Sequence, residues 1–420
     1  MKSIRQGLVS LVGAGILGQL INIIALPIVS RLYNPDDFGV FSVFNSALLL
    51  LIPFAGASYP YALVLAKSYH INYLFYVSIL MSLAISFVLF LSFEVFDNIM
   101  KLQGIKDYST LIVLYFIVYT IVLLYQQAAI RQKDYNIVSI SNILNIAFGT
   151  VIKMTVGITL AGIGSLGLVL GQLAGLLAQL AYFKLLQNSK RVFYKKNKKN
   201  SIYTLSLYSQ FPQYNIWVNF VSALNLSAPV FILGIYFSSS IVGLYAMART
   251  IMGIPGSVLG SALMNVFYPE IKEKYNNLPI LHMLLRTLRI LLALFIPTCI
   301  IMYLFLEDIF RFMLGDEWGV AGKMAFYIMV WQFFAICSRA TSPIYKVLDK
   351  MNVQALIDLV FLLVKFVPLI AFYHYSWYDA VSGILYICIV SSIQNALMLF
   401  ISLWLVYKHD IFLGKQTHNE

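Results

Sequence analysis

The sequence predicts an all-α, polytopic membrane protein of about twelve transmembrane helices. Of its 420 residues, 60% are hydrophobic and only 11% are charged, and the mean hydropathy is +0.83. A water-soluble chain of this length would carry more charge. Long apolar runs are the second observation, because about 20 such residues cross roughly 30 Å of hydrocarbon.

The first apolar run is Leu8–Ser30, and eleven more follow it. These are Phe38–Ala66, Ile71–Phe93, Ser109–Ile130, Ile137–Leu160, Ile163–Phe183, Leu205–Phe237, Ile241–Tyr268, Leu284–Leu306, Met324–Tyr345, Val353–Tyr375 and Ala380–Tyr407. Prolines fall inside several runs, and membrane helices tolerate them where neighbours or water satisfy the freed carbonyls.

The basic residues predict the orientation. With the N-terminus in the cytoplasm, 20 of the 29 Lys and Arg lie in cytoplasmic segments, five lie in outer loops and four lie inside spans. This bias places both chain termini in the cytoplasm. It also accounts for most of the net charge of +12, so binding of nucleic acid is not implied.

One long basic segment, Lys184–Ser201, separates the sixth span from the seventh. We expect an N-terminal lobe at 1–186, a cytoplasmic linker at 187–203 that touches anionic lipid head groups, and a C-terminal lobe at 204–420. Six spans in each half predict parallel repeats. Short similarities, such as KDYNIVSISNIL to DKMNVQALIDLV, fit a repeat and are also short enough to arise by chance.

Cysteine and histidine give no sign of a metal or a cofactor. All three cysteines lie within spans, and the five histidines are scattered without a ligand spacing. The first apolar run is a full span rather than a short cleavable signal, so we expect it to remain as the first helix.

Five ionisable residues lie inside spans, where each costs roughly 2.5 to 3.5 kcal/mol at the helix centre unless it faces a protein interior or water. They are Lys153, Arg249, Arg339, Lys365 and Asp358. Four cations against one anion suggest a cavity whose missing counter-charge is an anionic ligand. The alternatives are snorkelling to the membrane surface or local pairing. Asp358 is either a counter-ion to Lys365 or a titratable carboxylate that couples transport to an ion gradient.

Polar side chains recur at helical spacing beside these charges. The sets are Asn142, Asn145, Gly149 and Lys153; Gln354, Asp358 and Lys365; Gln332 and Arg339; and Asn215, Asn219 and Ser222. Each set shares one helix face. Such stripes would line a hydrated cavity, or they would hydrogen-bond between helices and fix the packing. For the amides the sequence leaves both interpretations open.

Two further patterns are interpreted as structural. Asn34 to Asp37 resemble a helix start, with Asn as the cap, Pro in the first turn and acids at the positive end of the dipole. The spacing of Gly167, Gly171 and Gly175, and of Gly256 and Gly260, allows two helices to approach closely.

Three segments resemble a known family. GQLINIIALPIVSRLYNPDDFGVFSVF near the start, VFYPEI at Val266–Ile271 and LGDEWGVAG at Leu314–Gly322 are similar to the Wzx-type polysaccharide-export flippases of the multidrug/oligosaccharidyl-lipid/polysaccharide (MOP) superfamily. The likeness extends over nearly the whole chain in length, span number and loop placement, and none of the three segments is a catalytic signature.

The resemblance implies two six-helix lobes around a central cationic cavity in the bacterial inner membrane. Such proteins move undecaprenyl-diphosphate-linked oligosaccharide from the cytoplasmic to the periplasmic leaflet, beside the polymerase and chain-length proteins of the same pathway. Lys153, Arg249, Arg339 and Lys365 would then hold the diphosphate. The polar stripes would meet the sugar, and the lobes would rock in alternating access.

Two rival functions remain. A multidrug antiporter of the same superfamily is expected to use acidic residues inside its N-terminal half, and the first six spans hold no buried carboxylate. A membrane enzyme of glycan assembly is expected to carry a large outer loop or a soluble domain. The longest outer segments, Glu94–Tyr108 and Glu307–Lys323, are too short to fold by themselves.

Overall fold

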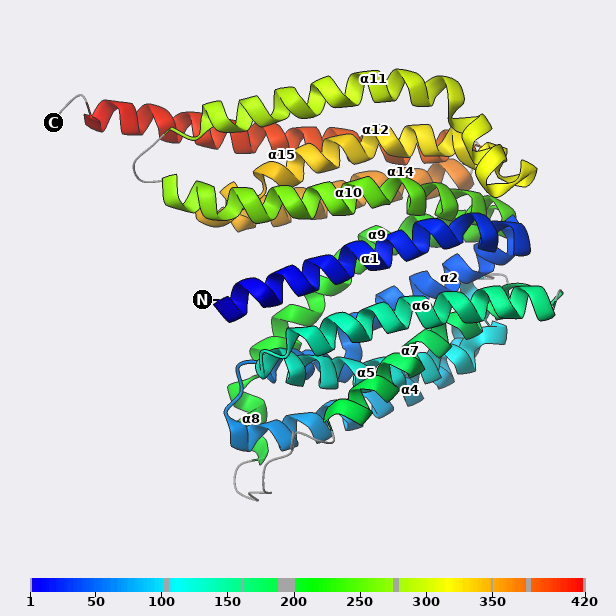
Figure 1. The fold of residues 1–420 in the computed structure, drawn as a ribbon. Helices are drawn as coiled ribbons and strands as arrows, with labels where there is room; N and C mark the ends of the chain where they lie inside the picture. The colour runs from blue at the N-terminus through cyan, green and yellow to red at the C-terminus, as the bar shows by residue number, and fades with distance from the viewer. Residues whose placement is uncertain are drawn as a thin grey trace. The chain divides into compact units, whose positions relative to one another are not determined.

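The computed structural model describes residues 2–100, 106–160, 162–187, 201–274, 279–348, 350–374 and 379–417. Within these ranges every regular element is helical and no strand occurs (Figure 1). The all-α prediction is therefore confirmed.

Fifteen α-helices follow one another along the described chain. They are α1 (Lys2–Leu32), α2 (Pro35–Leu51), α3 (Tyr59–Ala62), α4 (Ile71–Met100), α5 (Ser109–Arg131), α6 (Tyr135–Thr159), α7 (Ser165–Gln187), α8 (Ser201–Leu207), α9 (Ile216–Tyr236), α10 (Ser239–Lys274), α11 (Leu281–Leu314), α12 (Gly319–Thr341), α13 (Pro343–Val347), α14 (Met351–His374) and α15 (Ala380–Thr417). Shorter turns are η1 (Ile52–Ser58), η2 (Ser68–His70), η3 (Lys106–Tyr108), the π-helical η4 (Phe211–Asn215) and η5 (Asp316–Trp318).

Among the described residues, twelve helical stretches are long and apolar enough to cross a membrane. Each of them overlaps one of the expected spans. The predicted number of spans is therefore confirmed. The ninth span, Leu281–Leu314, is longer than expected. Only 6% of its most apolar stretch is buried inside the protein, as expected for a helix that faces lipid.

The chain forms two compact units, Met1–Gly243 (unit 1) and Leu244–Glu420 (unit 2). The seventh span, α9, lies in unit 1, where the Ser227 hydroxyl donates to the Ser46 carbonyl of α2 at 3.2 Å. By these contacts α9 groups with the first six spans, whereas the predicted C-terminal lobe begins at residue 204. Most of the linker at 187–203 lies outside the described residues, so a lobe boundary there stays a prediction.

Helices α6 and α7 approach each other closely in unit 1, and glycines make this possible. A Cβ added at Gly175 would lie 2.3 Å from the Asn145 carbonyl oxygen. One added at Gly149 would lie 2.9 Å from the Gly171 carbonyl oxygen. The two backbones therefore nearly touch, and the predicted packing role of the glycine row is confirmed.

Helix α2 begins with the predicted cap. The Asn34 side chain accepts a hydrogen bond from the Asp37 amide at 2.8 Å, and Asp37 Oδ2 accepts one from the Asn34 amide at 3.3 Å. Pro35 occupies the first turn. This reciprocal pair is a capping box, which satisfies two amides that the helix leaves without partners.

The second span, Phe38–Ala66, is predicted as a single run, but it is not one continuous helix. Helix α2 ends at Leu51, the backbone leaves helical conformations from Ala55 to Ser58, and the short α3 follows. Pro53 and Pro60 flank this interruption. Each lacks an amide hydrogen, so neither can continue the helical hydrogen-bond ladder.

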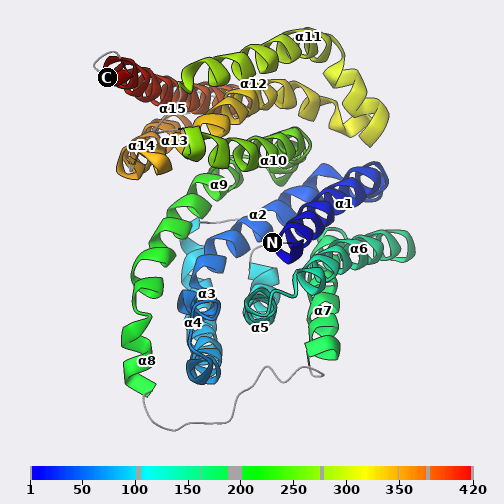
Figure 2. The same ribbon diagram turned by 60° about the vertical axis from the view of Figure 1, so that its left-hand side comes forward.

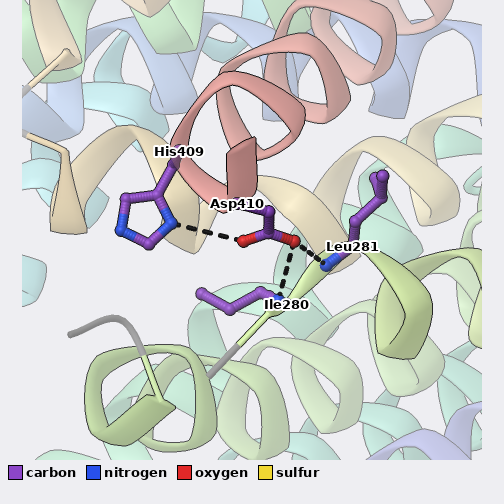
Figure 3. Close-up of polar contacts among 4 residues, drawn as sticks. All are labelled: Ile280, Leu281, His409 and Asp410. Atoms are coloured by element: carbon purple, nitrogen blue, oxygen red, sulfur yellow. Dashed lines mark hydrogen bonds and ion pairs between the residues drawn. The ribbon is translucent and has the colours of Figure 1, made fainter. Parts of the chain in front are cut away.

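In unit 2, α12 packs beside α11 and α15, and α15 also packs beside α14 (Figure 2). At the N-terminus of α11, the N-cap residue Ile280 provides no side-chain cap. Instead, Asp410 of α15 accepts from the amides of Ile280 and Leu281 at 3.0 and 2.9 Å, and His409 Nδ1 lies 3.3 Å from the other carboxylate oxygen (Figure 3). A side chain distant in sequence thus caps α11 and joins it to α15.

Replacing Asp410 with Ala is expected to destabilise unit 2 by about 1 to 2 kcal/mol, because α11 loses its cap and a negative charge at its positive end. Thermal unfolding of the purified protein measures the effect. Asp308→Ala on the exposed side of α11 is the control and should change stability by less than about 0.5 kcal/mol. Equal destabilisation by the two variants would contradict the assigned cap.

Candidate functional site: intramembrane cations and their polar neighbours

The predicted site residues lie inside candidate spans of both units. Unit 1 contains Asn142, Asn145, Lys153, Asn215 and Asn219, and unit 2 contains Arg249, Gln332, Arg339, Asp358 and Lys365.

Lys153 of α6 lies against apolar and aromatic groups. Its Nζ is 4.7 Å from the centre of the Phe41 ring on α2, and the Tyr33 hydroxyl donates to its carbonyl oxygen at 2.8 Å. A Cβ at Gly171 would lie 2.3 Å from Lys153 Cγ, so the side chain crosses the glycine row of α7. No salt bridge to Lys153 is found within the described ranges. A cation–π contact stabilises the ammonium without neutralising it.

Asn142 and Asn145 form hydrogen bonds with a residue outside the predicted set. Gln179 of α7 donates to Asn142 Oδ1 at 2.9 Å and accepts from Asn145 Nδ2 at 2.7 Å, with only 4% of its surface exposed. Both hydrogen bonds join α6 to α7. They are the contacts expected if these amides fix the packing of the helices. The signal was present in the sequence, because Gln179 continues the four-residue spacing of Gly171 and Gly175.

Replacing Gln179 with Leu is expected to destabilise the protein by about 1 to 2 kcal/mol, because two amides lose their partner inside the membrane. Thermal unfolding measures this loss, and glycan export should persist if the bridge is structural. Gln132→Leu, on an exposed residue after α5, is the matched control. Loss of export at unchanged stability would instead assign Gln179 to ligand binding.

Asn215 and Asn219 lie at the start of α9. Asn219 Nδ2 donates to the carbonyl and to the side-chain oxygen of Asn215, at 2.8 and 3.0 Å. Ser222, on the same face, donates to the Val218 carbonyl at 3.0 Å. Asn219 and Ser222 are both exposed in unit 1. Polar side chains at this depth are tolerated where they meet water or protein, so this face of α9 suits a hydrated surface.

Arg249 lies on α10, one helical turn after the fully buried Tyr245. The Tyr245 hydroxyl lies beside the Arg249 guanidinium, and Tyr373 of α14 approaches the same hydroxyl. A guanidinium carries five donors and cannot lose its charge in a protein. Arg249 therefore keeps its positive charge near a buried tyrosine.

Arg339 and Gln332 of α12 cross two glycines of α10. Arg339 Nη1 donates to the Gly256 carbonyl at 2.8 Å, and a Cβ at Gly260 would lie 2.7 Å from Arg339 Cδ. Gln332 Oε1 would lie 2.7 Å from a Cβ at Gly256. Both glycines thus make room for side chains of α12, and a close approach of two helix backbones at Gly256 and Gly260 stays a prediction. Arg339 is exposed, and its described hydrogen bond uses one donor of five, so the others can reach a ligand.

Asp358 and Lys365 lie on α14, as the spacing predicts. Asp358 accepts from Gln394 Nε2 of α15 at 2.8 Å, while Lys365 is 7% exposed and feels the attraction of Asp358. The two do not form a salt bridge in the described structure. Gln394 is thus the direct partner of the carboxylate, and Lys365 acts on it at longer range. The role of Asp358 as counter-ion or coupling group stays a prediction.

The charges inside the spans remain unbalanced. No salt bridge to Lys153, Arg339 or Lys365 occurs within the part of the chain that the structure describes. A desolvated cation without an acid is costly, and an anionic ligand would offset that cost.

The sequence profile of a family described as "Polysaccharide biosynthesis protein" matches residues 28–323. The chain belongs to this family of polysaccharide biosynthesis proteins. Among curated proteins, none matches the sequence.

Solved structures show the fold of this polysaccharide biosynthesis protein. An inward closed structure of the lipid II flippase MurJ is 15% identical, with a TM-score of 0.71 over 95% of this chain and 89% of that one. An inward-facing multidrug resistance MATE family transporter of the MOP superfamily is 13% identical, with a TM-score of 0.67 over 93% and 95%. A MOP superfamily transporter from Pyrococcus furiosus is 14% identical, with a TM-score of 0.61 over 96% of each chain.

These neighbours confirm the resemblance at the level of the fold. These neighbours are transporters and a flippase, and the family places the chain in polysaccharide biosynthesis. At 13 to 15% identity they carry the fold alone.

Proposed function

We propose that this polysaccharide biosynthesis protein is a flippase for undecaprenyl-diphosphate-linked oligosaccharide repeat units. It moves them from the cytoplasmic to the periplasmic leaflet of the bacterial inner membrane, with both chain termini in the cytoplasm. One observation carries the proposal: Lys153, Arg339 and Lys365 lie within spans, and no described carboxylate forms a salt bridge with any of them.

The diphosphate supplies the missing negative charge. A guanidinium binds phosphate oxygens through short, parallel, charge-assisted hydrogen bonds, and an ammonium acts as a point charge. In this proposal Arg249 and Arg339 of unit 2 hold the diphosphate, and Lys365 of the same unit adds a third positive charge. Lys153 provides the cation of unit 1.

The remaining parts of the substrate match the remaining surfaces. The oligosaccharide needs hydrogen-bonding groups, which Asn215, Asn219 and Gln332 offer on exposed or half-buried positions. The undecaprenyl chain needs only hydrocarbon and can stay in the bilayer. Transport by alternating access would expose the bound head group first to the cytoplasm and then to the periplasm.

The carboxylates argue against a cation-binding drug antiporter. In the described part of the first six candidate spans, the only acids are Asp36 and Asp37 at the start of α2. Asp37 belongs to the capping box. A binding site of net positive charge repels a cationic drug and attracts a diphosphate.

A deletion strain tests the function. Loss of the protein should leave complete lipid-linked repeat units on the cytoplasmic face, and the wild-type gene should restore their export. If single units still reach the periplasm, the protein acts after translocation, as a polymerase would. Increased drug sensitivity with normal glycan export would instead favour the antiporter.

A further inference from the structure

The interruption of the second span places the backbone in an unfavourable conformation. Ala55 has a ψ of 116°, and Gly56, Ala57 and Ser58 have φ values of 56°, 51° and 60°. The left-handed region suits glycine, whereas a residue with a Cβ pays for it. Two of these three consecutive left-handed residues carry a Cβ, so other contacts must hold them there.

Groups from α4 and from the same segment hold the interruption in place. The Gly56 amide donates to Ser82 Oγ of α4 at 2.8 Å, and Ser58 Oγ donates to the Pro53 carbonyl at 3.0 Å. A Cβ at Gly56 would lie 2.8 Å from Ser78 Cβ. The interrupted form therefore requires glycine at position 56 and a hydroxyl on α4.

A second form of this segment satisfies the same buried groups. In a continuing helix the Gly56 amide would donate to the Ile52 carbonyl, four residues earlier. Ser82 would keep its partner, because its hydroxyl already lies 2.9 Å from Thr120 Oγ1. Pro60 has no amide hydrogen for the Gly56 carbonyl, so such a helix would be kinked and not straight. Neither form leaves the buried amide of Gly56 unpaired, which permits an exchange between them.

We propose that Ala55–Ser58 is a conformational hinge, at which the second span changes between the interrupted form described here and a proline-kinked helix. The proposal rests on the proposed function in one respect only, since it assigns the two forms to steps of a transport cycle. The exchange itself is a property of unit 1 and needs no substrate.

Distances between two spin labels in unit 1 test the hinge. With Cys299, Cys337 and Cys388 replaced by Ser, labels are attached to cysteines at the exposed Asp36 of α2 and at Leu65, which is 71% exposed. Arg131 of α5 donates to the carbonyls of Leu63 and Ala66, so the segment that carries Leu65 is anchored. Pulsed electron paramagnetic resonance of the purified protein then gives the distance distribution.

We expect two distances in the parent protein and opposite shifts in two variants. Ala57→Gly removes the cost of a Cβ at a φ of 51° and should raise the ratio of interrupted to kinked form about fivefold. Gly56→Ala should lower that ratio. The matched controls are Ala84→Gly on the exposed face of α4 and Gly15→Ala, where no atom lies within 4 Å. Both controls should leave the ratio unchanged.

One unchanged distance in the parent and in both variants would overturn the hinge, as would equal shifts in the controls. If Gly56→Ala fails to fold, Ala57→Gly decides alone, because it only removes a methyl group. The glycan export assay tests the proposed function, and its result does not depend on these distances. An export defect in Ala57→Gly with an unaltered distance distribution would overturn the hinge and leave the proposed function standing.

Discussion

Replacing Arg339 with Ala is expected to weaken binding of the lipid diphosphate about tenfold to a hundredfold and to block glycan export. The variant loses charge-assisted hydrogen bonds, each worth about 1.5 to 3 kcal/mol. Arg339→Lys keeps the charge and loses the planar fork of donors, so it should fall between Ala and the wild type. Export of the glycan to the cell surface and the amount of protein in the membrane are measured together.

The same experiment at Lys153 separates charge from packing. Lys153→Met keeps a flexible apolar side chain over the Phe41 ring and beside Gly171, and removes only the ammonium. We expect it to block export at normal protein levels. Arg311→Ala is the control, because Arg311 is exposed and pairs with Glu307 in the same helix, a contact worth little. Normal export in both Lys153→Met and Arg339→Ala would refute the assigned diphosphate site.

Replacing Gly175 with Val is expected to destabilise unit 1 by about 3 kcal/mol or more, which would remove most folded protein from the membrane. A Cβ at this position would meet the Asn145 carbonyl oxygen at 2.3 Å, and a backbone atom cannot move aside as a side chain does. Overpacking against flexible side chains already costs roughly 1 to 3 kcal/mol. Thermal unfolding of the purified protein and its yield from membranes both report the effect.

The control for this second prediction is Gly15→Val on the exposed side of α1, where an added Cβ meets no atom within 4 Å. Both variants make the same chemical change in a helix, so their difference isolates the contact between α6 and α7. Similar stability of the two variants would show that these helices can separate at little cost. The close packing described here would then not be needed for the fold.

The sequence predicted the parts of the fold that depend on local chemistry. All twelve spans follow from hydropathy, because a helix in lipid must be apolar over its whole length. The capping box at Asn34 and the packing of Gly175 also follow from short patterns. Each of these features is determined by residues close together in sequence.

Features that depend on distant neighbours were not predictable. The interruption at Ala55–Ser58 lies within an apolar run, and its left-handed backbone depends on Ser82 of α4, a contact that hydropathy does not register. The sequence does not show which partners Gln179 and Gln394 have. Only the helix packing shows that Gln179 of α7 bonds to Asn145 and that Gln394 of α15 bonds to Asp358. The grouping of α9 with unit 1 likewise depends on a contact between residues 181 positions apart.

The central claim is that fixed positive charge inside the spans binds an anionic, lipid-linked head group. Its most direct test is the affinity of the purified protein for undecaprenyl diphosphate compared with uncharged undecaprenol. Our account predicts that the wild-type protein prefers the diphosphate and that the preference disappears when Lys153, Arg339 and Lys365 are replaced together by Met, Gln and Met. Equal affinity for the two lipids in the wild type, or an unchanged preference in the triple variant, would contradict it.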